Sequence, residues 1–133
     1  MKHKRLFLAS LVCMFCCLIT LTSCQKSNEC TGVIYTYVED DITGITTPIG
    51  GCQLDIGYFQ DTDPEKELDP NIKRSVLTDP NGYYEGTWSR EVYLLVEAKK
   101  QVNSEQYLYG IGYLDLLLKN TTKLLIPLEL RNY

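Results

Sequence analysis

Residues 76–84, Val76-Leu77-Thr78-Asp79-Pro80-Asn81-Gly82-Tyr83-Tyr84, decide the fold class. Apolar and β-branched residues flank a tetrapeptide whose Asp, Pro and Gly suit the first, second and fourth positions of a type I turn. Two strands joined by such a turn form a hairpin, and Trp88 lies further along the second strand. The segment therefore predicts antiparallel β-structure on both sides of the turn.

Short strands continue in both directions from this turn. Residues 52–58 alternate, with Cys52, Leu54, Ile56 and Tyr58 on one face, which predicts a half-buried strand. The nearly continuous apolar run 92–98 predicts a central strand covered on both faces. Pro127 cannot donate to a ladder, so the last strand is expected at an edge or at a bulge. The predicted strands are 33–38, 52–58, 76–78, 83–88, 92–98, 107–114 and 124–130. Seven strands without a helix predict an all-β, antiparallel β-sandwich.

The N-terminus has the layout of a secretory signal. Lys2, Lys4 and Arg5 precede an uncharged apolar run over residues 6–21, which is the order of regions in a signal peptide. This run is shorter than the roughly 20 apolar residues that a membrane-spanning helix needs. We therefore expect a cleaved signal.

At the end of this run stands Leu21-Thr22-Ser23-Cys24, which resembles the lipobox of bacterial lipoproteins. The resemblance implies cleavage between Ser23 and Cys24 and the attachment of palmitate-type acyl chains to Cys24. Two or three such chains hold a protein stably on a membrane. Gln25 replaces the aspartate of inner-membrane lipoproteins, which implies the outer membrane and leaves its periplasmic and surface faces open. The expected organisation is signal peptide 1–23, lipidated tether 24–30 and β-sandwich domain 31–133.

Signal cleavage changes the composition of the working protein. The only histidine, His3, leaves with three of the 13 basic side chains, whereas all 17 acidic ones stay, so the net charge becomes −7. Without histidine, Ser-His-Asp and Cys-His catalytic sites and His-ligated metal sites are excluded. A negative domain also repels phosphate backbones. The sequence thus predicts no catalytic residues, no cofactor, no metal and no nucleic-acid partner.

Cys30 and Cys52 are the two remaining thiols. An oxidising envelope compartment would allow a disulfide between them. If each opens one of two antiparallel neighbouring strands, however, they lie at opposite ends of the ladder, too far apart for a bridge. The alternative has Cys52 as a small buried residue and Cys30 in the tether.

Residues 60–71 are rich in acids and contain two prolines, which is typical of a solvated loop. The spaced carboxylates suggest calcium as an alternative, but the glycine of an EF-hand loop is missing. Two pairs, Asp61 with Asp63 and Glu65 with Glu67, are the nearest candidates for a glycosidase. Such an enzyme needs its carboxylates on rigid walls of a cleft, so an enzyme is not expected.

Four segments together resemble the carboxypeptidase regulatory-like domain: Gly32-Val33, 48–56, 78–84 and 93–98. The resemblance covers roughly Thr31 to Leu130. It implies a transthyretin-like (prealbumin-like) Greek-key sandwich of the kind found in Bacteroidota lipoproteins. It implies no catalytic residue, because members of this family are accessory modules.

The expected function is therefore that of a non-catalytic, membrane-anchored binding or scaffolding module of the cell envelope, with a protein partner. The alternative is a glycan-binding surface lipoprotein of a nutrient-uptake system, because aromatic faces stack on sugars. Trp88, Tyr83 and Tyr84 are the candidate ligand contacts.

Overall fold

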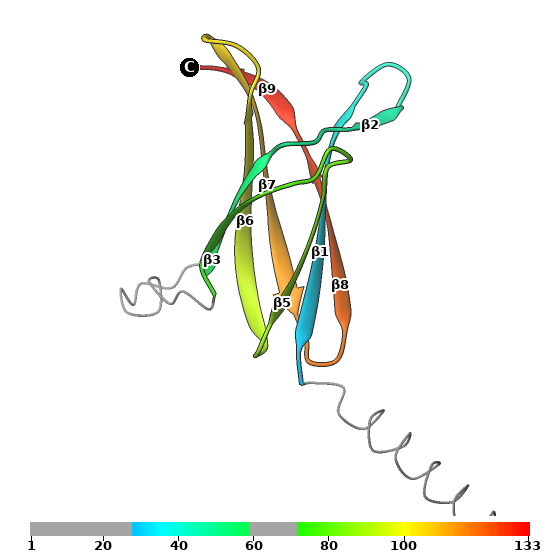
Figure 1. Ribbon diagram of the computed structural model, residues 1–133. Coiled ribbons are helices and arrows are strands. Elements are labelled where there is room, and N and C mark those ends of the chain that lie inside the picture. The colour runs from blue at the N-terminus through cyan, green and yellow to red at the C-terminus, as the bar shows by residue number, and fades with distance from the viewer. Residues whose placement is uncertain (1–27, 59–71) are drawn as a thin grey trace, which may run out of the picture.

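Every regular element in the described part of the chain is a β-strand. The computed structural model describes residues 28–58 and 72–133, and these ranges form nine strands (Figure 1). The all-β prediction is confirmed. The strands are β1 (Cys30–Glu39), β2 (Thr46–Pro48), β3 (Gln53–Tyr58), β4 (Arg74–Leu77), β5 (Tyr83–Trp88), β6 (Val92–Gln101), β7 (Gln106–Leu116), β8 (Thr121–Pro127) and β9 (Glu129–Asn132).

The strands form two sheets that bury their inner faces against each other. In the four-stranded sheet, β1 pairs with β5, β8 and the short β2; the five-stranded sheet has the order β4-β3-β6-β7-β9. In Figure 1, β1 and β8 lie on one side of the molecule and β3 and β6 on the other. This arrangement agrees with the predicted β-sandwich. The largest fully buried apolar side chains are Trp88, Ile34, Leu54, Ile56, Ile72, Leu94, Leu114, Leu116, Ile126 and Val96.

The chain has more strands than predicted, partly because the last predicted strand changes sheets. β8 ends at Pro127, which has no N–H to continue the ladder. Leu128 is buried and its N–H donates to the carbonyl of Tyr37 (2.7 Å), after which β9 pairs with β7. Both halves lie at sheet edges, so the predicted edge position is confirmed. The other additional strand, β2, is not marked by any sequence pattern.

One ladder is parallel. β8 runs in the same direction as β1, from the pair Thr31↔Thr121 to the pair Tyr37↔Pro127, whereas the other ladders of the described residues are antiparallel. β7 runs towards the end where β1 begins, and the turn after it reverses the chain, so β8 leaves that end alongside β1. The N–H of Thr31 donates to the carbonyl of Asn120 (3.0 Å) and fixes this turn. The purely antiparallel prediction is therefore wrong at this pair.

The predicted turn at residues 79–82 forms, but it connects the two sheets. The N–H of Gly82 donates to the carbonyl of Asp79 (3.0 Å), and the Asp79 carboxylate accepts from the N–H groups of Asn81 and Tyr83. However, β4 pairs with β3 and β5 pairs with β1, so the hairpin prediction is wrong. The cause lies just before the turn. Thr78 exchanges hydrogen bonds with Cys52, which keep the chain in the five-stranded sheet.

Residues 48–52 close against this turn. The carbonyl of Ile49 accepts from the Thr36 hydroxyl (2.7 Å) and from the Cys52 thiol (3.3 Å). The N–H of Thr36 in turn donates to the carbonyl of Gly82 (2.8 Å). We call Thr36 with segments 48–52 and 78–83 the clasp. Because its members come from both sheets, the clasp holds the two sheets together at one end.

The two thiols are separate. Cys30 and Cys52 are both buried and free. Cys52 lies in the clasp, whereas Cys30 precedes Thr36 by six residues of extended strand, about 20 Å. The predicted separation at opposite ends is confirmed, although β1 and β3 lie in different sheets and are not neighbours. Cys30 begins β1 with a buried side chain, so it belongs to a strand of the sandwich. Burial, and then the charge of Glu91, raise the pKa of the Cys30 thiol.

The central position of β6 is confirmed, since it lies between β3 and β7. Its inner face is buried, through Leu94, Val96 and Ala98. Its outer face is not covered as predicted, because Tyr93 is 47% exposed and Leu95 is only half-buried. The near-continuous apolar run therefore has two uses: one side fills the core and the other side forms surface.

Candidate functional site

Trp88, the first candidate ligand contact, belongs to the core. Its side chain is only 2% exposed, and its indole N–H donates to the carbonyl of Ile72 (3.4 Å). Two glycines that pair across β1 and β5, Gly32 and Gly86, make room for the ring, since a Cβ on either would lie about 3 Å from it. The guanidinium of Arg74 covers the ring at 4.0 Å from its centroid. Trp88 therefore cannot contact a ligand in this structure.

Tyr83 and Tyr84 point to opposite sides of β5, because successive strand residues alternate. Tyr84 shares the inner side with Trp88. Tyr83 lies on the outer face of the four-stranded sheet, edge-on to Tyr35 with ring centroids 5.2 Å apart. The three predicted contacts thus do not form one surface.

The Tyr83 hydroxyl donates to the Glu85 carboxylate at 2.6 Å. This hydrogen bond, followed by burial and nearby negative charges, raises the pKa of Tyr83 to about 12. A raised pKa in the folded state stabilises the fold at pH values below the ordinary pKa of 10, and this contribution is lost as the pH rises through 12.

We expect Glu85→Gln to lower the pKa of Tyr83 towards 10, because it removes the charge that stabilises the protonated hydroxyl. The pKa of Tyr83 is measured from the phenolate absorbance near 295 nm between pH 9 and 13. Subtracting the titration of the same protein carrying Tyr83→Phe leaves the signal of Tyr83. An unchanged late titration in Glu85→Gln would contradict the assignment.

The outer face of the five-stranded sheet is the candidate binding face. Tyr93 and Leu95 of β6 lie beside Ile111 and Tyr113 of β7 in the β6–β7 ladder.

 In that ladder Leu95 pairs with Tyr113. Tyr93 and Tyr113 hold their rings nearly parallel, with an interplanar angle of 6° and centroids 6.0 Å apart. They are 47% and 45% exposed, and Ile111 is 44% exposed. These side chains form an ordered apolar surface in the middle of the sheet.

Tyrosines and cations continue this face towards β9. The ammonium of Lys99 lies 4.3 Å from the ring centroid of Tyr107 and 4.8 Å from that of Tyr133. The guanidinium of Arg131 lies 4.5 Å from the ring centroid of Tyr109. Burial, and then the charge of Glu97, raise the pKa of Tyr109. The rings are thus held in place by charged neighbours.

A hollow of about 380 Å³ opens on the same face over β3, β4 and β6. Gly57 contributes backbone alone to this hollow. On one wall, the Asp55 carboxylate accepts from the hydroxyl of Ser75 (2.8 Å) and the amide of Gln53 (3.4 Å), which fixes its orientation. The residues whose side chains share this face and line the hollow include Asp55, Lys73, Ser75, Leu95 and Glu97.

Sequence reasoning did not identify this face. The alternation of Tyr107, Tyr109, Ile111 and Tyr113 with Gly110 and Gly112 contains a usable signal. A Cβ on either glycine would lie within 3 Å of β8 or of the residues beside it, so the glycine side is the packed side. Glycines at alternate positions thus indicate that the tyrosines between them face solvent.

Several predicted residues lie outside the described ranges: Ser23, Cys24 and the acidic residues 61–69. Within residues 28–58 and 72–133, no three or more His, Cys, Asp or Glu side chains are grouped to hold a metal ion. No helix in these two ranges has the length and apolar character to cross a membrane. The chain matches no protein-family model, no curated protein and no solved structure.

Proposed function

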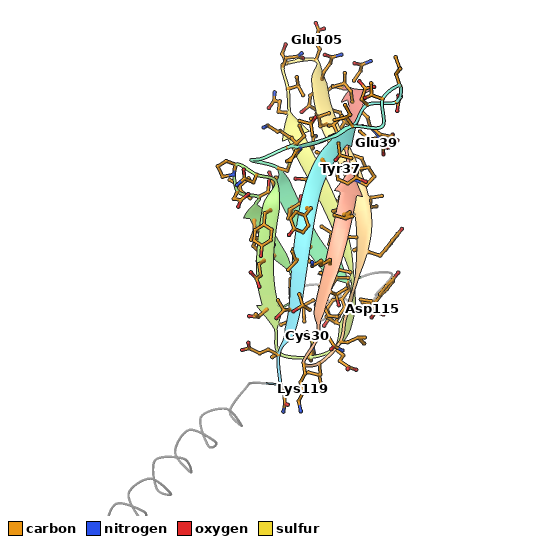
Figure 2. The ribbon with its side chains drawn as sticks, turned by 90° about the vertical axis from the view of Figure 1, so that its right-hand side faces the viewer. Cys30, Tyr37, Glu39, Glu105, Asp115 and Lys119 are labelled. Carbon is orange, nitrogen blue, oxygen red and sulfur yellow. The ribbon has the colours of Figure 1, made fainter. Side chains whose placement is uncertain are left out.

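We propose that the chain is a lipid-anchored protein of the bacterial cell envelope, whose β-sandwich is a non-catalytic binding or scaffolding module. The candidate lipid site, Cys24, precedes β1 by six residues. Figure 2 shows Cys30 and Lys119 at one end of the sandwich and Glu39 and Glu105 at the other. An anchor at Cys24 would hold the first end near the membrane and leave the long faces of both sheets accessible.

The exposed apolar surface around Tyr93 and Tyr113 carries this proposal. Exposed apolar side chains are common singly, but a contiguous group bordered by polar residues marks a binding site. Tyrosine in particular gives a large contact area at a small cost in side-chain entropy. Here the rings are already ordered by their neighbours, so binding would immobilise few additional side chains.

For the finer fold, we propose a transthyretin-like Greek-key sandwich with β2 and β9 as additions. Two of the segments that carry the family resemblance support this proposal. Residues 48–52 and 78–83 meet in the clasp, which is a reason for them to recur together in a family of sandwiches.

Capture of partners from native membranes tests the proposed function. We expect Tyr113→Ser to reduce recovery of the partner roughly tenfold or more, because central aromatic residues dominate binding energies. Leu125→Ser is the matched control, since Leu125 is 62% exposed on the opposite sheet. Equal recovery by both variants, or loss with the control alone, would contradict the assignment of the binding face.

A separate experiment tests the anchor. Cys24→Ala removes the only thiol at the cleavage point, so we expect the variant to lose incorporation of labelled palmitate. Cys30→Ala should keep it, because Cys30 is buried in the sandwich. Incorporation that survives Cys24→Ala would show that the protein is not lipidated there.

A further inference from the structure

Gly57 stands apart from the other eight glycines of the chain. Three of them have positive φ angles, between 68° and 74°: Gly44, Gly51 and Gly82. Five others, Gly32, Gly50, Gly86, Gly110 and Gly112, leave no room for a side chain, because a Cβ would lie within 3 Å of a neighbouring atom. Gly57 has neither constraint. A Cβ there would meet no atom of the described residues within 4 Å, and the φ angle is not positive.

A glycine inside a strand has a cost, and no contact of the described residues explains that cost at Gly57. Glycine loses more conformational freedom on folding than other residues and packs no side chain, so it weakens a strand. Such a glycine often marks a place where a ligand approaches the backbone closely. At Gly57 the place is the hollow on the candidate binding face.

The lining of the hollow indicates the class of ligand. Its volume of about 380 Å³ lies in the range of small-molecule sites. The carboxylates of Asp55 and Glu97 accept hydrogen bonds, the ammonium of Lys73 donates them, and the Ser75 hydroxyl does both. Side chains of both charges are present, so the lining does not select a strongly charged ligand. Leu95 adds an apolar patch.

We propose that this hollow binds a short, neutral saccharide directly over Gly57. A saccharide presents hydroxyls that both donate and accept around its rim, which suits the polar wall, and it presents an apolar C–H face, which suits Leu95. This inference rests on the proposed function as a binding module and names its ligand and its site. The absent side chain at residue 57 lets the sugar ring reach the backbone of β3.

Gly57→Ile is the decisive variant, because it places a side chain in the hollow where a Cβ would meet no atom of the described residues within 4 Å, and because isoleucine is favoured in strands. We expect it to fold with an unchanged or higher thermal midpoint. Thr121→Ile is the matched control: it adds the same side chain at an exposed strand position of the other sheet. Glu97→Gln, which keeps the side-chain size, is a second test of the polar wall.

The probes are neutral glucose, mannose and galactose oligosaccharides of about two to six units, titrated calorimetrically into each protein. We expect binding by the unaltered domain and by Thr121→Ile, and a loss of affinity of about tenfold or more in Gly57→Ile and Glu97→Gln. If no probe binds, or if Gly57→Ile binds as well as the unaltered domain, the inference is wrong. The proposed function would still be judged separately, by partner capture with Tyr113→Ser.

Discussion

Trp88→Ala is expected to lower the free energy of unfolding by about 3–5 kcal/mol, the usual cost of truncating a buried tryptophan. The indole is fully enclosed between the paired glycines Gly32 and Gly86 and the guanidinium of Arg74. Neither glycine has a side chain that could move into the space, so the cavity would persist. Because small domains are stable by only about 5–15 kcal/mol, the variant would be close to unfolding at ordinary temperature.

Chemical denaturation followed by circular dichroism measures this loss. Trp88→Phe is the control, since it keeps an aromatic ring under Arg74 and should cost clearly less than the alanine variant. A loss below about 1 kcal/mol in Trp88→Ala, which is typical of surface positions, would contradict the core assignment and restore Trp88 as a candidate ligand contact.

Gly82→Ala is expected to destabilise the domain by about 2 kcal/mol or more. Its φ of 74° is unfavourable for alanine, at about 1–2 kcal/mol. In addition, the new Cβ would lie 2.5 Å from the carbonyl oxygen of Thr36 and 2.8 Å from that of Ile49. Relief of this clash would pull the clasp apart, because both carbonyls hold its hydrogen bonds.

Gly44→Ala separates these two effects. Gly44 has a similar φ of 69°, but a Cβ there would meet only the Glu39 carboxylate, at 4.0 Å. It should therefore show the backbone cost alone, and the difference between the two variants, measured by denaturant unfolding, is the cost of opening the clasp. Equal losses in both would show that the clasp contributes no stability.

Strand positions were predictable from the sequence because alternation is local. The inward set Cys52, Leu54 and Ile56 is buried as expected, and β6 is central as expected. Pairing partners were less predictable. The turn at 79–82 has the residues of a hairpin turn, but Thr78 bonds to Cys52, which is 26 residues away in the chain. Local turn chemistry contains no information about that contact.

The candidate binding face was not predicted for a related reason. Trp88 is the most conspicuous aromatic residue in the sequence, but its burial depends on Gly32, which meets it only through the β1–β5 ladder. The hollow over Gly57 is lined from three strands, and its glycine can be distinguished from the other eight only when the surroundings of each are known. Such a site depends on tertiary structure, which alternation along one strand does not specify.

Hydroxyl-radical footprinting of the protein in isolated cell envelopes, compared with the purified domain, tests the proposed binding face most directly. It requires no knowledge of the ligand. We predict that oxidation of Tyr93 and Tyr113 falls in the envelope sample, while Ile42 (96% exposed) and Leu125 (62% exposed) stay equally reactive in both samples. Unchanged reactivity of the two tyrosines, or protection confined to Leu125, would contradict the account.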